Sequence, residues 1–259
     1  MEPQTMDGTF LFASWPVIVE GTSSGEHWPT VVRNAAPGLH RACSLIALAW
    51  DEPWQVRTAA TNPYNLPPHA PESWPDPNGF DLFPPLYEPA DHVEALPSWV
   101  AEAWTRLESD VGLAAALDSW HEGKLLTALH PSFALVAFSG AIETTARLAQ
   151  VEGVQGNGSA AWFWAGVASV VGAEETENLR LRKKAWYKRS GTAHGGALHG
   201  IERTFGSEFM LRVDLDLMAQ GKSQVMLDPD DPVQAFVLDL VPSFCRTARS
   251  LILRCLGVR

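Results

Sequence analysis

The feature that most constrains the fold is a proline-rich stretch in the first half of the chain. Ten of the 19 prolines fall between residues 62 and 97. Because proline fixes φ and removes a backbone donor, neither a helix nor a central strand can run through this stretch. We therefore expect a connection there, which divides the 259 residues into an N-terminal region, 1–61, and a larger C-terminal domain, 98–259.

The N-terminal region carries mixed signals. Residues 8–21 hold β-branched and aromatic runs broken by Pro16, and they predict one or two short strands or an irregular segment. Residues 38–50 place apolar side chains three or four positions apart, which predicts an amphipathic helix with Pro37 in its first turn. The expectation is a small, irregular α+β region of unknown role.

The C-terminal domain has helical periodicity almost throughout. The fourth predicted helix has acidic residues in its first turn and cations in its last turns, an order that complements the helix dipole. Gly195 and Gly196 follow it, as glycine does after many helices. Pro242 predicts a bend in the last helix. The predicted helices are 98–122, 131–153, 159–172, 173–194 and 231–257. The sequence thus predicts a mainly α fold, a bundle of about five helices.

The composition excludes several classes of protein. Hydrophobic residues make up 46% and charged residues 19%, as in soluble globular proteins. Three widely spaced cysteines form neither a disulfide framework nor a zinc pattern, so buried reduced thiols are expected. Residues 1–20 lack a signal peptide, and no apolar run is long enough to span a membrane. We expect a cytoplasmic protein without membrane partners.

Positive charge is concentrated in one place on an acidic chain. The formal net charge is −11, yet six of the 19 basic residues lie within 180–189. Such a cluster could bind a phosphate-bearing ligand locally while the acidic remainder repels it. The alternative is a solvated helix face that balances Glu174, Glu175 and Glu177 one or two turns earlier.

Motifs for most known chemistries are absent from the sequence. There is no P-loop, dinucleotide-binding glycine motif, zincin motif, nucleophile elbow or EF-hand loop. His194 and His199 lack a nearby carboxylate or thiolate at ligand spacing, so they make a weak metal site. We expect neither a metal nor a cofactor.

Arg189 and His194 remain as candidates for chemistry. An offset of five residues places them 140° apart with about 7.5 Å of rise, but a long arginine and a histidine that leans back can border one patch. Histidine can accept the proton of a ribose 2′-OH, and arginine can stabilise charge on a phosphate. The alternative is a histidine at a helix C-terminus beside a surface arginine.

The segment "LRKKAWYKRSGTAHGG" resembles the signature helix of the HEPN superfamily, most closely the Apea-like branch. Its matching positions are Tyr187, Arg189, Ser190, His194 and Gly195. An upstream segment, 138–148, resembles the earlier family helix that carries a glutamate, here Glu143. The resemblance covers about residues 98–258. It implies an all-α bundle that pairs two copies of the 180–196 helix into one ribonuclease site.

The resemblance implies a metal-independent endoribonuclease of toxin–antitoxin or antiphage defence, and it implies Arg189 and His194 as the catalytic pair. Glu143 would orient one of them, or alternatively pair with Arg147. An antitoxin or another defence protein is an expected partner. The residues expected to bind RNA are Arg180, Arg182, Lys183, Lys184, Tyr187, Lys188 and Ser190. The alternative function is a non-catalytic HEPN-fold module that binds RNA, a nucleotide or a protein.

Overall fold

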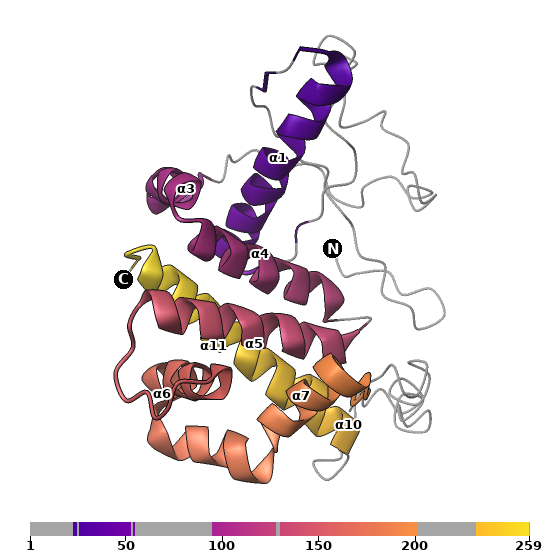
Figure 1. The fold of residues 1–259 in the computed structure, drawn as a ribbon, viewed down its shortest axis with the longest axis vertical. Helices are drawn as coiled ribbons and strands as arrows, with labels where there is room; N and C mark the ends of the chain where they lie inside the picture. The colour runs from indigo at the N-terminus through magenta and orange to yellow at the C-terminus, as the bar shows by residue number, and fades with distance from the viewer. Residues whose placement is uncertain are drawn as a thin grey trace, which may run out of the picture. The chain divides into compact units, whose positions relative to one another are not determined.

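The computed structural model describes residues 23–24, 26–52, 54, 95–127, 130–200 and 232–258. These residues are mainly helical, and none of them lies in a strand (Figure 1). The strands predicted in 8–21, and all but the end of the proline-rich connection, lie outside the described residues. The mainly α class predicted for the C-terminal domain is confirmed.

The chain divides into two units, Met1–His40 with Val56–Leu96 and Arg41–Gln55 with Pro97–Arg259. Helix α1, Trp28–Trp50, begins in the first unit and ends in the second. It starts ten residues earlier than predicted, so Pro37 lies inside it rather than in its first turn. Pro29 takes the place near the start where a proline costs no helical hydrogen bond.

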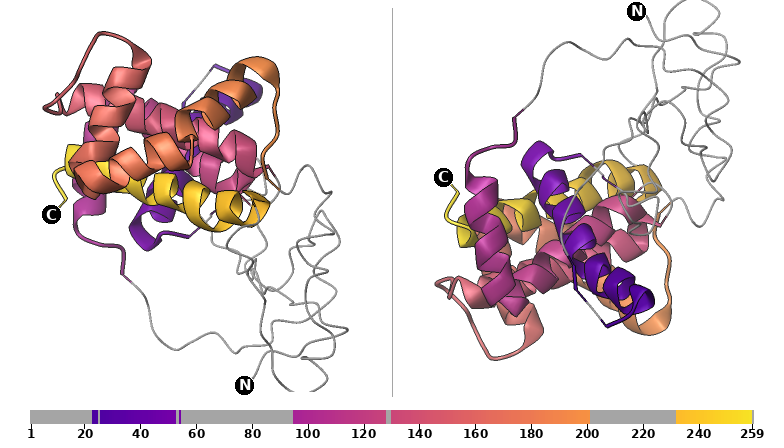
Figure 2. Two further views of the ribbon diagram at one scale, coloured as in Figure 1. Left: turned by 90° about the horizontal axis from the view of Figure 1, so that it is seen from below. Right: turned by 90° about the horizontal axis from the view of Figure 1, so that it is seen from above.

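In the second unit, α5 lies at the centre and contacts α4, α6, α7 and α11 (Figure 1 and Figure 2). The buried aromatic side chains of this core are Trp120, Phe138, Phe163, Phe236 and Phe244. The elements are α3 Trp99–Ser109, α4 Val111–Leu126, α5 Pro131–Leu148, α6 Ser159–Glu177, η2 Asn178–Arg182, α7 Ala185–Gly195, α10 Pro232–Ala235, η4 Phe236–Leu240 and α11 Val241–Cys255.

Two predicted helices are each broken in the structure. The helix predicted over 98–122 is interrupted at Asp110, whose carboxylate caps α4 by accepting the N–H of Leu113 at 2.9 Å. The prediction of a single helix over 173–194 is also wrong. It becomes the end of α6, the π-helical turn η2 and α7, with Lys184 in the left-handed region (φ 49°) before α7.

The last helical segment departs from regular α-helix near Pro242, where the sequence predicted a bend. The π-helical turn η4 directly precedes α11, and Pro242 is in the first turn of α11. A proline in a continuous helix would meet the carbonyl group four residues earlier, and a wider π-helical turn gives that carbonyl room. The irregularity also brings Phe236 and Leu240 into the core.

Polar contacts join the end of α1 to the other helices of its unit. The guanidinium of Arg249 donates two hydrogen bonds to the carbonyl oxygen of Leu48, at 2.8 and 3.2 Å. Lys124 pairs with Asp51 at 2.8 Å. Cations at a helix C-terminus satisfy its last carbonyl groups and its dipole, so these contacts stabilise the last turn of α1.

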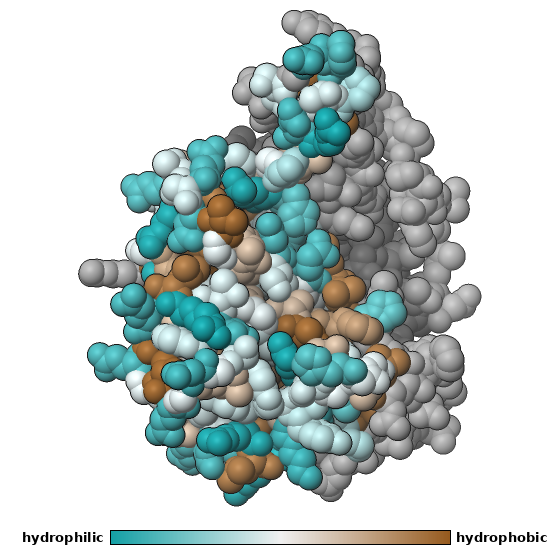
Figure 3. Space-filling model, viewed as in Figure 1, coloured by the Kyte–Doolittle hydropathy of each residue, from teal (hydrophilic) through white to brown (hydrophobic). Residues whose placement is uncertain are grey.

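None of the described helices is both long and apolar enough to cross a bilayer. On the face shown in Figure 3, the described hydrophobic residues lie in small, separate groups among hydrophilic ones.

Candidate functional site

Helix α7 carries half of the predicted site residues, both proposed catalytic ones included, and is anchored on one side. Ala185 and Thr192, seven residues apart, are buried, and α7 packs against α5. Trp186 is half-buried and packs against the core, on Phe163 with 5.1 Å between ring centroids. The helix ends at Gly196, whose φ of 64° favours glycine. Tyr187 and His194 of the same helix are exposed.

Arg189 and His194 have different surroundings. The guanidinium of Arg189 lies 4.9 Å from the Trp186 ring centroid. Its Nε is buried and has no hydrogen-bond partner among the described residues. His194 is exposed in the last turn of α7. Arg189 is half-buried, and no hydrogen bond joins its side chain to that of His194.

Glu143 lies on α5 and is held by a neighbour on its own helix. Arg147 donates to the Glu143 carboxylate at 2.9 Å, with the i, i+4 spacing typical of a helix-surface ion pair. Arg147 also lies 5.5 Å from the Trp162 ring centroid. Of the two alternatives raised for Glu143, the pair with Arg147 is the one present.

The predicted RNA-binding residues fall into two groups. The exposed ones are Arg180, Arg182, Lys184 and Tyr187. The half-buried ones are Lys183, Lys188 and Ser190. Lys183 forms ion pairs with Asp239 at 2.6 Å and Glu175 at 3.5 Å, so its charge is balanced within the fold. Part of the cationic cluster is therefore neutralised, as the surface-helix alternative expected, and part is not.

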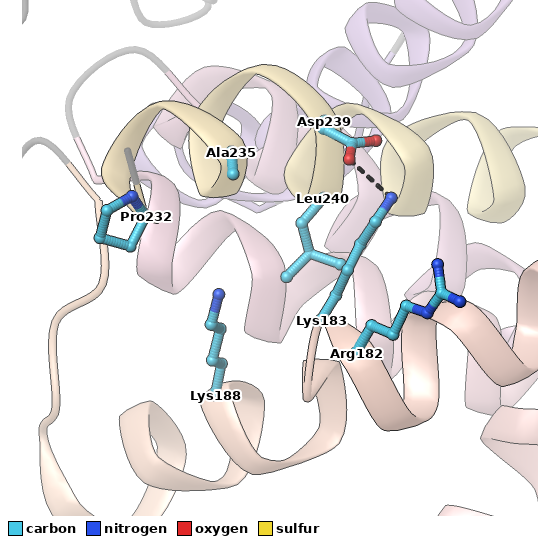
Figure 4. Close-up of a pocket in the computed structure, with 7 residues that line it drawn as sticks. All are labelled: Arg182, Lys183, Lys188, Pro232, Ala235, Asp239 and Leu240. Atoms are coloured by element: carbon cyan, nitrogen blue, oxygen red, sulfur yellow. Dashed lines mark ion pairs between the residues drawn. The ribbon is translucent and has the colours of Figure 1, made fainter. Parts of the chain in front are cut away.

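A pocket of about 170 Å³ lies between the η2–α7 region and the start of the last helical segment (Figure 4). Its lining residues are Arg182, Lys183, Lys188, Pro232, Ala235, Asp239 and Leu240. Burial lowers the pKa of Lys188, whose Nζ lies 5.3 Å from the Phe236 ring centroid. Sequence reasoning missed Asp239 and Pro232, because nothing in a local pattern links them to the 180–189 cluster.

The chain after α7 lies close to that helix. A Cβ on Gly191 would be 3.5 Å from the Cβ of Ala197 and 3.7 Å from Nε2 of His199. The backbone N–H of His199 donates to the Ser132 hydroxyl at 2.8 Å. His199 is thereby fixed against α5 at its backbone, whereas His194 is exposed.

Other candidate chemistries have less support in the structure. Ser44 and His121 hydrogen bond at 3.0 Å, with Asp118 3.3 Å from the serine hydroxyl, but the first two are 0% and 1% exposed. These residue types resemble a hydrolase triad that no substrate can reach. Among the described residues no three His, Cys, Asp or Glu side chains gather as metal ligands. The cysteine thiols are free, and burial raises their pKa values.

No family model, curated protein or solved structure matches this chain.

Proposed function

We propose that this chain is a metal-independent endoribonuclease of the HEPN type, with Arg189 and His194 as its catalytic residues. The observation that carries the proposal is the exposure of His194, one turn and a half after an arginine that is stacked on Trp186. A guanidinium stacked on an indole ring and an accessible imidazole are sufficient groups for RNA cleavage without a metal.

In the proposed reaction His194 takes the proton of a ribose 2′-OH. The 2′-oxygen then forms a bond to the neighbouring phosphorus, and Arg189 stabilises the negative charge that builds on the phosphate oxygens. The bond from phosphorus to the 5′-oxygen breaks, and His194 returns its proton to that oxygen. The products are a 2′,3′-cyclic phosphate and a 5′-hydroxyl end. The proposal assigns no step to Glu143, whose carboxylate pairs with Arg147.

Substrate binding follows from the exposed cations before α7. Arg180, Arg182 and Lys184 are exposed and can contact backbone phosphates, which gives binding that weakens as salt rises. Tyr187 is 74% exposed, so its ring is accessible for stacking on a base.

A homodimer through the 180–196 segment is part of the same proposal. Two large hydrophobic side chains of this segment are exposed, Leu181 at 62% and Tyr187 at 74%. Two copies facing each other would cover these side chains and bring two Arg189–His194 pairs to one groove. The family resemblance is what supports a role in toxin–antitoxin or antiphage defence, with an antitoxin as partner.

The test is cleavage of a varied RNA pool by the purified chain in EDTA. The wild type should cleave, and Arg189→Ala and His194→Ala should each lower the rate by about a hundredfold or more while remaining folded. Arg180→Ala is the matched control, because it removes an exposed arginine of the same segment and should lower only binding. Absence of cleavage, or equal cleavage by all four proteins, would instead favour the non-catalytic binding module.

A further inference from the structure

The pocket beside α7 has a chemical character of its own. In Figure 4 the side chain of Lys188 points from α7 toward α10, Lys183 points toward Asp239, and Arg182 extends along one edge. The lining side chains carry three positive charges and one negative charge. Apolar atoms of Pro232 and Leu240 form much of the rest. The arrangement is a small cationic hollow in an acidic protein.

Lys188 is a half-buried cation of this pocket that no carboxylate of the described residues compensates, whereas Arg182 is exposed to solvent. Lys183 is held by the carboxylates of Asp239 and Glu175. Lys188 forms no ion pair within the part of the chain that the structure describes, and its Nζ lies over the Phe236 ring. Burial disfavours its charged form and lowers its pKa. A bound anion would restore the interactions that the ammonium group loses on leaving water.

The size of the pocket limits what that anion can be. A volume of about 170 Å³ exceeds what a single bound water needs. It falls well short of the roughly 300–1,000 Å³ typical of sites that enclose drug-sized ligands. A group of a few atoms, such as phosphate, fits inside, while the remainder of a larger ligand would lie outside.

We propose that this pocket binds the terminal phosphate of a phosphomonoester, with the ammonium groups of Lys188 and Lys183 as its donors. A phosphomonoester carries a charge of about −1.5 to −2 near pH 7, so a lining with a formal charge of +2, or +1 once Glu175 beside Lys183 is counted, attracts it more strongly than a singly charged group. A phosphodiester carries a single negative charge and matches less well. Asp239 competes with the phosphate for Lys183, so it weakens binding.

The pocket is distinct from the proposed cleavage site. On a helix Lys188 points about 100° away from Arg189 and about 120° away from His194, so the pocket opens on another side of α7. The inference therefore does not rest on the proposed function. Phosphate binding can be measured without cleavage, and Arg189→Ala and His194→Ala should bind phosphate as the wild type does.

The experiment is a calorimetric titration of the full chain at low ionic strength with inorganic phosphate and with adenosine 5′-monophosphate. Lys188→Met should weaken binding of both at least about tenfold, because a charge-assisted hydrogen bond is lost. Arg180→Gln is the matched control, since it removes one charge from an exposed residue outside the pocket and should change affinity less than about threefold. Asp239→Asn should strengthen binding several-fold, because the competing carboxylate is gone.

The Asp239→Asn gain keeps the test decisive even if Lys188→Met folds poorly, since a merely structural role predicts no gain. Equal losses in Lys188→Met and Arg180→Gln, or no binding by the wild type, would overturn the proposal. Two oligoribonucleotides, with a 5′-phosphate and with a 5′-hydroxyl, separate the sources of the phosphate. If the wild type binds the phosphorylated strand more tightly than the mononucleotide, and Lys188→Met loses this difference, the ligand is the phosphorylated end of an RNA. Equal affinity for strand and mononucleotide identifies a small phosphorylated ligand, and equal affinity for both strands would refute the monoester.

Discussion

The guanidinium of Arg189 lies over the indole ring of Trp186, with 4.9 Å between Cζ and the ring centroid. The two residues are three positions apart on α7 and therefore neighbours on its surface. Trp186 packs in turn on Phe163, which is fully buried. The proposed phosphate-stabilising arginine thus rests on a ring that itself packs against the core.

Replacing this platform should slow RNA cleavage. Trp186→Leu removes the cation–π contact, and because such a contact contributes about 0.5–1 kcal/mol, the turnover number should fall about two- to fivefold. Trp186→Phe keeps a ring under Arg189 and should lose less. The measurement is turnover at saturating RNA, with thermal unfolding recorded separately. Unchanged turnover in a folded Trp186→Leu variant would show that the stack does not orient Arg189.

Two glycines test the packing around α5. A Cβ on Gly123 of α4 would lie 2.6 Å from the Phe138 ring, so Gly123→Ala should cost about 1–3 kcal/mol of the free energy of unfolding. At Gly140 of α5 the nearest atom is 3.6 Å away, and Gly140→Ala should stabilise by about 0.4–1 kcal/mol. Urea unfolding of both variants measures the difference. If both substitutions changed the free energy of unfolding in the same direction, the close approach of α4 and α5 would be contradicted.

The proposed homodimer can be disrupted at one exposed apolar residue. Leu181→Glu places a charge in the expected interface and should convert the dimer to a monomer in sedimentation velocity. Val111→Glu is the matched control, because Val111 is 80% exposed on α4 and lies outside the 180–196 segment. A monomeric wild type, or a dimer that resists Leu181→Glu, would exclude this interface.

The buried thiols make a prediction about alkaline pH. Burial raises the pKa of Cys43 above its ordinary value of 9.0, so the unfolded chain releases this proton at a lower pH than the folded protein does. The stabilisation is complete below about pH 9 and is lost as pH rises through the folded pKa. Lys188, with its lowered pKa, acts in the opposite direction. Comparison with Cys43→Ala isolates the thiol.

The free energy of unfolding of wild type relative to Cys43→Ala should therefore decline between pH 8 and pH 11. Alkylation by iodoacetamide should likewise reach its half-maximal rate at a higher pH in the native protein than in urea. A native thiol that reacts at the same pH as the denatured one would contradict burial as the cause.

The spacing of residue types along the chain predicted those parts of the fold that depend on residues close in sequence. Apolar spacing located the helical segments of the C-terminal domain. The i, i+4 spacing of Glu143 and Arg147 likewise raised their ion pair as an alternative, and that pair is present. These features rest on residues three or four positions apart, which a sequence displays directly.

The features that sequence reasoning missed depend on packing between distant segments. Asp110 could have been recognised as a capping residue, since Ser109, Val111 and Gly112 beside it are poor helix formers, but the apolar spacing that continues across it concealed the break. Lys184 adopts a left-handed conformation that nothing in a run of two lysines predicts. Leu179 and Ala185, both 0% exposed, are buried on either side of it, so tertiary packing imposes the break. Likewise, the contact between Lys188 and the Phe236 ring joins residues that are far apart in the sequence, so no local pattern predicts it.

The most direct test of the proposed chemistry compares an RNA oligonucleotide with a copy that is 2′-deoxy throughout, incubated with the chain in EDTA. The account predicts that the RNA is cleaved to 2′,3′-cyclic phosphate and 5′-hydroxyl ends, and that the deoxy strand stays intact because it has no attacking hydroxyl. Cleavage of both strands, or 5′-phosphate ends on the products, would contradict attack by a ribose hydroxyl with Arg189 and His194.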